Sequence, residues 1–135
     1  MGSRVLIVDD DALVRKVMRD VLTNEGYLVV GEASDGRRGV ALYHQLAPDL
    51  VLMDVMMPEL SGIEALRQII AIAPHARVVM VSALEQRRVI IEALVIGACD
   101  YVVKPFSAAK LLEAVDKVMC VGLVSGWRAD DEVSD

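Results

Sequence analysis

The chain has 135 residues, of which 55% are hydrophobic and 4% aromatic, and its formal net charge is −6 at pH 7. This length fits one domain with an aliphatic core, and no apolar run reaches the roughly 18 residues that a membrane span needs. The sequence contains no basic stripe that would favour direct binding of nucleic acid. Cys99 and Cys120 lack metal-ligand spacing, and a strand pattern follows residues 1–3 directly. We therefore expect a cytoplasmic domain without a signal peptide or disulfides.

Strand and helix patterns alternate in the first half of the chain. We expect strands at about residues 4–8, 27–31 and 50–53. Apolar residues at helical spacing predict a helix after the first strand, which Gly26 ends, and Asp35 and Gly36 lead into the next helix. The third strand is apolar throughout, as a strand buried on both faces should be.

The second half repeats this alternation. We expect strands at about residues 77–81 and 100–103, and helices around 63–70, 86–96 and from Ser107 to Met119. Ser107 is a residue type that caps helices. Five strand–helix units with short connections predict an α/β fold with one doubly wound parallel sheet. We expect this domain to span residues 4–119, followed by a partly disordered tail at 120–135.

Polar residues stand at the carboxyl ends of four of the expected strands. Asp9 and Asp10 follow the first strand, Asp54 the third, Ser82 the fourth and Lys104 the fifth. In a parallel sheet these ends meet at one edge, where α/β proteins bind their ligands. We therefore expect these five residues to form one site.

The residue types at this edge favour phosphoryl transfer to a carboxylate. Crowded carboxylates repel one another unless a cation joins them, and Mg²⁺ prefers oxygen ligands. Bound Mg²⁺ would let an anionic phosphoryl donor approach Asp54, which is the natural nucleophile. Lys104 offers a positive charge and Ser82 a hydrogen bond to the phosphoryl oxygens. Asp11 is interpreted instead as the N-cap of the first helix.

These motifs resemble the receiver domains of two-component response regulators. The resemblance covers nearly all of the expected domain and rests on Val-Asp-Asp10, Asp54-Val-Met-Met-Pro58, Ser82-Ala83 and Tyr101-Val-Val-Lys104-Pro105. The chain is most similar to stand-alone, chemotaxis-type regulators, since no output domain follows. The resemblance implies a flavodoxin-like fold with five strands in the order 2-1-3-4-5 and five helices.

The resemblance also implies how the acidic residues act. Asp54 is the acceptor of a phosphoryl group from a sensor histidine kinase or a phosphotransfer protein. Asp10 binds Mg²⁺ directly, Asp9 binds it mainly through water, and Asp54 and the backbone carbonyl of Met56 complete the protein ligands. Such a domain is a regulatory phosphoacceptor in a phosphorelay, and it assists only its own phosphorylation and dephosphorylation.

The remaining implied roles concern the response to phosphorylation. Ser82, where Thr is commoner in the family, is the switch hydroxyl, and Lys104 contacts the phosphoryl group. Tyr101 turns inward when Ser82 moves toward the phosphate. The Lys104–Pro105 peptide bond is expected to be cis, which is a property of X-Pro bonds in tight functional turns.

The output surface is expected on the fourth helix, the fifth strand and the fifth helix. The segment at residues 86–96 is apolar over more than one face, which is typical of a covered helix. We expect Arg87, Ile90, Leu94 and Tyr101 to contact a downstream effector protein or a second copy of the chain. Ordinary core packing is the alternative explanation for these apolar residues.

Four alternatives to a stand-alone receiver domain are open from the sequence. A phosphatase of the haloacid-dehalogenase class needs a second aspartate two residues after the first, where this chain has Met56. A flavodoxin-like redox module needs a phosphate-binding first loop, and Asp9, Asp10 and Asp11 would repel a phosphate. A binding module with an inactive site would not need the complete acceptor set. The chain could also be the receiver part of a larger regulator with a DNA-binding or enzymatic output domain.

Overall fold

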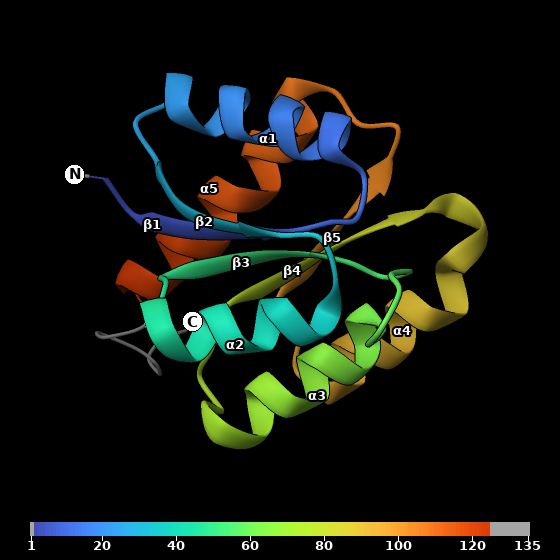
Figure 1. Ribbon diagram of the computed structural model, residues 1–135. Coiled ribbons are helices and arrows are strands. Elements are labelled where there is room, and N and C mark those ends of the chain that lie inside the picture. The colour runs from blue at the N-terminus through green and yellow to red at the C-terminus, as the bar shows by residue number, and fades with distance from the viewer. Residues whose placement is uncertain (1, 125–135) are drawn as a thin grey trace.

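The protein forms one parallel sheet with helices on both faces (Figure 1). The structure is a computed structural model that describes residues 2–124. The strands are β1 (Arg4–Val8), β2 (Leu28–Ala33), β3 (Leu50–Asp54), β4 (Val78–Ala83) and β5 (Asp100–Lys104). The helices are α1 (Ala12–Asn24), α2 (Gly36–Leu46), α3 (Gly62–Ile72), α4 (Arg87–Ile96) and α5 (Ala108–Val124), with a short 3-10 helix, η1 (Leu84–Gln86), before α4. The strand order β2-β1-β3-β4-β5 confirms the predicted flavodoxin-like topology.

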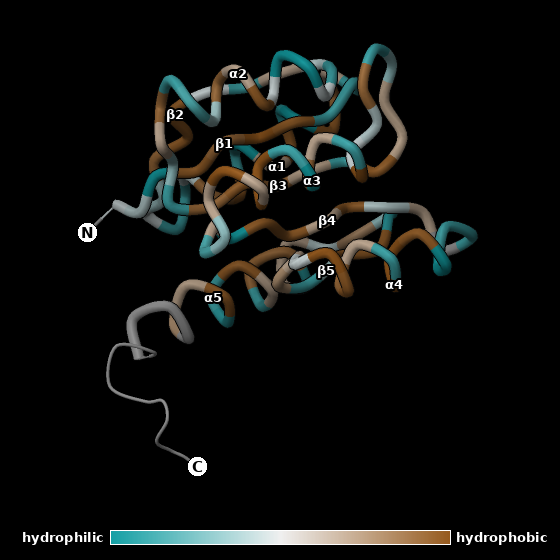
Figure 2. The backbone as a smooth tube through the Cα atoms, turned by 90° about the horizontal axis from the view of Figure 1, so that it is seen from below, coloured by the Kyte–Doolittle hydropathy of each residue, from teal (hydrophilic) through white to brown (hydrophobic). Residues whose placement is uncertain are grey.

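The helices lie in two layers, with α1 and α5 on one face of the sheet and α2, α3 and α4 on the other (Figure 1). Successive strand residues point to opposite faces. In β1, Val5 and Ile7 therefore pack with α1 and α5, whereas Leu6 and Val8 pack with α2 and α3. Both faces are covered, so the central strands are apolar along most of their length, as the hydropathy colouring in Figure 2 shows for β1 and β4.

Side-chain caps fix the start of four helices. Asp11 accepts hydrogen bonds from two backbone amides of the first turn of α1, and Asp35, Ser61 and Ser107 each accept one at α2, α3 and α5. These caps satisfy amide groups that have no partner within the helix. The predicted capping roles of Asp11 and Ser107 are confirmed. Gly97, with φ of 144°, ends α4 where the sequence predicts its end.

Element ends differ from the predictions where pairing partners decide them. Strand β2 was expected at residues 27–31, but it continues to Ala33 because Ala33 pairs with Val8 of β1. Helix α5 continues to Val124, although the apolar pattern weakens after Met119. The predicted disorder falls mainly on residues 125–135, which lie outside the described part of the chain. Among residues 2–124, no helix is long and apolar enough to cross a membrane.

Candidate functional site

The carboxyl ends of β1, β3, β4 and β5 meet at one edge of the sheet and carry the predicted polar residues. Asp54 and Lys104 are the last residues of β3 and β5, and Asp9 follows β1 directly. Asp54 pairs with Val81 of β4, so the next residue, Ser82, lies at the same edge. The parallel register therefore brings together side chains that are up to 95 positions apart in the sequence.

Three carboxylates and one ammonium group form the centre of this site. Asp9, Asp10 and Asp54 each offer a carboxylate oxygen within 4.8 Å of the other two. The Nζ atom of Lys104 lies 3.0 Å from Oδ2 of Asp9, and it donates a hydrogen bond of 3.3 Å to Oδ1 of Asp54. Asp9 and Asp54 are buried, whereas Asp10 is exposed. A single lysine cannot balance three carboxylates, so the site carries excess negative charge at its solvent-facing side.

Burial and charge shift the protonation of the two central groups. Burial, together with the Asp9 carboxylate, raises the pKa of Asp54 to about 7, although Lys104 acts in the opposite direction. Burial lowers the pKa of Lys104, but the close carboxylates of Asp9 and Asp54 outweigh this effect and the net shift is upward. Lys104 therefore stays positively charged, while the ionised form of Asp54 is unfavourable without a further cation.

Two buried oxygen atoms lack hydrogen-bond partners among the described residues. These atoms are Oγ of Ser82 and Oδ2 of Asp9. The Asp9 atom has only its ion-pair contact with Lys104, without the geometry of a hydrogen bond. Buried polar atoms are nearly always satisfied, so such exceptions are typical of a ligand site. An oxygen-binding divalent cation fits the acids, and a tetrahedral anion fits the Ser82 hydroxyl and the Lys104 ammonium.

The loop after β3 returns closely to the acceptor strand. The amide of Gly62 donates a hydrogen bond of 2.8 Å to the carbonyl oxygen of Val55. A Cβ atom at Gly62 would lie 1.9 Å from the carbonyl oxygen of Asp54, so only glycine fits. This need for glycine depends on the folded loop, so no local pattern in the sequence predicts it. The side chain of Met56 in the same loop is exposed, and its carbonyl remains a predicted metal ligand.

Three of the four residues of the expected output surface are exposed, and one is buried. Arg87 and Leu94 of α4 are exposed, as expected. Ile90, however, is only 5% exposed, so its assignment to the surface is wrong. Ile90 lies with Ala93 on the buried side of α4, whereas Ile91 and Val95, at 56% and 82% exposure, are outward-facing residues that the predicted output surface did not include. Their i, i+4 spacing places them on one face of the helix, and this spacing could have identified them as a pair.

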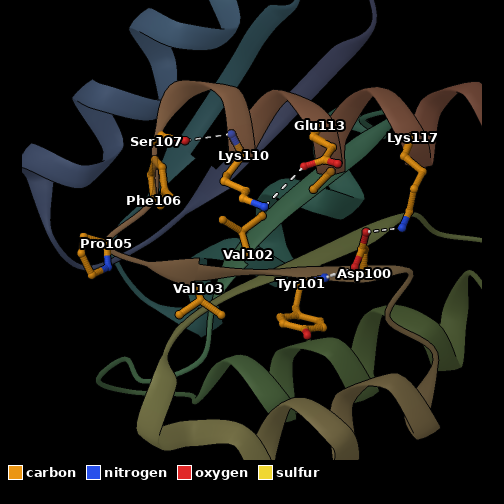
Figure 3. Close-up of a pocket in the computed structure, with 11 residues that line it drawn as sticks. Asp100, Tyr101, Val102, Val103, Pro105, Phe106, Ser107, Lys110, Glu113 and Lys117 are labelled. Atoms are coloured by element: carbon orange, nitrogen blue, oxygen red, sulfur yellow. Dashed lines mark hydrogen bonds and ion pairs between the residues drawn. The ribbon is translucent and has the colours of Figure 1, made fainter.

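Tyr101 belongs to β5, and Pro105 follows this strand directly. The Lys104–Pro105 bond is cis, as expected. Tyr101 is 43% exposed, and Figure 3 shows its ring directed from β5 toward α4, on the opposite side of the strand from α5. Its role as a switch stays a prediction. A groove of about 650 Å³ runs along β5 and α5, and Phe106, Lys110 and Lys117 are among the residues that line it (Figure 3).

Comparison with known proteins agrees with this geometry. Residues 5–116 match the response regulator receiver domain family. The chain is 48% identical to chemotaxis protein CheY of Thermotoga maritima, covering 87% of this chain and 98% of that protein. It is 45% identical to CheY of Bacillus subtilis, with coverage of 88% and 99%. A chain of the CheX–CheY–BeF₃–Mg²⁺ complex from Borrelia burgdorferi superposes with a TM-score of 0.84 at 35% identity, covering 87% of this chain and 89% of that one. The chain therefore belongs to the receiver domains of two-component response regulators, and it is of the regulatory CheY type.

Proposed function

We propose that the protein accepts a phosphoryl group on Asp54 in a Mg²⁺-dependent phosphorelay. The observation that carries this proposal is the grouping of Asp9, Asp10 and Asp54 within 4.8 Å, with Lys104 in contact with two of them. The unpartnered hydroxyl of buried Ser82 supports it further. The site therefore combines a carboxylate nucleophile with groups that favour an added anion.

The acids of the site fit a divalent cation. Asp9, Asp10 and Asp54 would hold Mg²⁺ together with the backbone carbonyl of Met56. When bound, the ion supplies the positive charge that allows an anionic donor to approach a carboxylate. The raised pKa of Asp54 agrees with this proposal, because burial and the neighbouring Asp9 carboxylate both disfavour its ionised form in the absence of a further cation.

The side chains divide the work of the transfer. A carboxylate oxygen of Asp54 forms the new bond to phosphorus as the bond between phosphorus and the histidine nitrogen of a kinase or phosphotransfer protein breaks. Lys104, already 3.3 Å from Oδ1 of Asp54, would contact one phosphoryl oxygen. Ser82 would move toward the phosphoryl group and donate a hydrogen bond to a second phosphoryl oxygen. The movement of Ser82 would let Tyr101 turn inward. Hydrolysis of the acyl phosphate in the same site would return the domain to its resting state.

The receiver is proposed to span residues 4–119 and to act in the cytoplasm. Its output would be binding of an effector protein, or of a second copy, through α4, β5 and α5. A larger regulator that contains this receiver is the second possibility, and the chemistry at Asp54 would be the same. The haloacid-dehalogenase alternative is disfavoured because the exposed Met56 stands where an acid/base aspartate is required.

The direct test is phosphorylation by a small donor. The protein is incubated with acetyl phosphate, with and without Mg²⁺, and its intact mass is measured. The expected result is a mass gain of one phosphoryl group with Mg²⁺, with acetate as the leaving group, and no gain with EDTA. A protein that stays unmodified under both conditions, or is modified equally well without a divalent cation, would contradict the proposed function.

The proposed output surface gives a second prediction. Leu94→Glu is expected to abolish self-association or effector binding, because an unpaired carboxylate buried in an apolar contact costs far more than the roughly 1–3 kcal/mol of a neutral polar group. Phosphorylation by acetyl phosphate should be unchanged, since Leu94 is remote from the acids in the fold. Ile72→Glu on α3 is the matched control, because Ile72 is an equally apolar exposed residue outside this surface. Sedimentation of the protein with BeF₃⁻ and Mg²⁺ measures the self-association, and equal losses for both variants would reject the surface.

A further inference from the structure

Arg15 of α1 connects the acidic site to the edge of the sheet. Its Nη1 atom donates a hydrogen bond of 2.6 Å to the backbone carbonyl oxygen of Asp9. Its Nε atom donates one of 3.3 Å to Oε1 of Glu32 in β2. Arg19, one helical turn further along, donates to the other carboxylate oxygen of Glu32. The guanidinium of Arg15 is thus held on one side by Glu32 and contacts the site on the other.

The contact with Asp9 falls on the peptide bond that leads into Asp10. The amide of Asp9 donates to the carbonyl oxygen of Ala33 at 3.0 Å, and Oδ1 of Asp9 accepts from the amide of Asp11 at 2.9 Å. The remaining polar group of the Asp9 backbone is the carbonyl, which Arg15 holds. Because a peptide unit is planar, fixing this carbonyl also fixes the backbone nitrogen and the Cα atom of Asp10.

We propose that Arg15 is a positioning residue that orients Asp9 and Asp10 for Mg²⁺. This inference rests on the proposed function, because it concerns the same metal site. Asp10 is the exposed acid of the cluster, and the backbone before it sets where its carboxylate can reach. Partners that orient metal ligands without touching the metal typically change metal affinity 10- to 100-fold when they are removed.

The charge of Arg15 has a smaller effect than its hydrogen bond. A positive charge near the acids would by itself weaken cation binding, so its removal would tighten the binding of Mg²⁺. Glu32, however, is ion-paired with both Arg15 and Arg19, and it offsets much of this charge. Loss of the fixed carbonyl orientation should therefore outweigh the loss of the charge, and removing Arg15 should weaken Mg²⁺ binding.

The test compares Mg²⁺ affinity in matched variants. The thermal unfolding midpoint of the wild type, Arg15→Met, Arg15→Lys and Arg19→Met is measured against MgCl₂ concentration at constant ionic strength, and the dissociation constant follows from the shift. Arg15→Met is expected to raise this constant about tenfold. Arg19→Met removes a cation from the same group of charges without touching Asp9, so its constant should stay within about twofold of the wild type. The phosphorylation rate of Arg19→Met at saturating Mg²⁺ should equal that of the wild type.

The outcomes separate this inference from the proposed function. A wild type that gains no stability from Mg²⁺ would overturn both. A wild type that binds Mg²⁺, together with an Arg15→Met variant that binds it equally well, would overturn only the role of Arg15. An equal loss of Mg²⁺ affinity in Arg19→Met would also overturn the role of Arg15, because charge or helix packing would then explain the effect. If Arg15→Met does not fold, Arg15→Lys replaces the planar fork with a single ammonium group, and an unchanged constant in that variant overturns the inference.

Discussion

Asp54→Asn is expected to take up no phosphate from acetyl phosphate at any Mg²⁺ concentration. The amide keeps the size of the side chain but lacks the carboxylate oxygen that forms the acyl phosphate. Asp9 and Asp10 are proposed to hold Mg²⁺ and not to accept the phosphoryl group, so no adduct is expected on them. Intact mass spectrometry of the wild type and the variant, incubated side by side, measures this directly.

The control for this variant lies at the other end of the same strand. Asp49 precedes β3, is exposed and accepts a hydrogen bond from the amide of Arg4. Asp49→Asn should be phosphorylated like the wild type, because it leaves the acceptor edge intact. A phosphate adduct on Asp54→Asn that equals that of the wild type would show that another residue is the acceptor.

The same variant has a second readout that shows whether it is folded. Burial and Asp9 raise the pKa of folded Asp54 to about 7, whereas an unfolded aspartate titrates at roughly 3.9. The fold therefore disfavours the ionised carboxylate, and the penalty grows as pH rises from about 4 and is complete above about 7. Without Mg²⁺ at pH 8, Asp54→Asn should unfold at a higher temperature than the wild type. This difference should disappear below pH 4, where both states of the wild type are protonated.

Gly62→Ala is expected to destabilise the protein by about 3 kcal/mol and to weaken the binding of Mg²⁺. The new methyl group would lie 1.9 Å from the carbonyl oxygen of Asp54 and 3.0 Å from Cα of Val55, so backbone must move. The hydrogen bond from Gly62 to Val55 holds the two segments together, and separating them would break it. The movement would displace the loop that carries Met56. Urea unfolding measures the stability, and the Mg²⁺-dependent thermal shift measures the affinity.

A second glycine provides the comparison. Gly26 has φ of 91°, and a Cβ atom there would meet nothing within 4 Å. Gly26→Ala should therefore cost only the strain of a left-handed backbone, about 1 kcal/mol, and leave Mg²⁺ binding unchanged. Equal destabilisation by the two variants would contradict the proposed close packing of the β3–α3 loop on the acceptor strand.

The features that the sequence determined by itself are local or periodic. Alternation of apolar strands and amphipathic helices predicts the doubly wound sheet, and the polar residues after the strands predict the site at its carboxyl edge. Asp11 and Ser107 cap helices through contacts within a few residues, so their roles are predictable from short range. The acceptor set converges because a parallel register leaves few other arrangements.

Tertiary packing decided the rest. The apolar residues of α4 look alike in the sequence, and the choice that buries Ile90 and exposes Val95 depends on the angle at which the helix meets the sheet. The end of β2 follows from its pairing with β1. Position 62 needs glycine because the folded loop brings it against the carbonyl oxygen of Asp54. The contact between Arg15 and Asp9 likewise requires α1 to lie beside β1 and β2. Periodicity and local hydrogen bonds are properties of neighbouring residues, whereas these contacts exist only once separate elements are packed together.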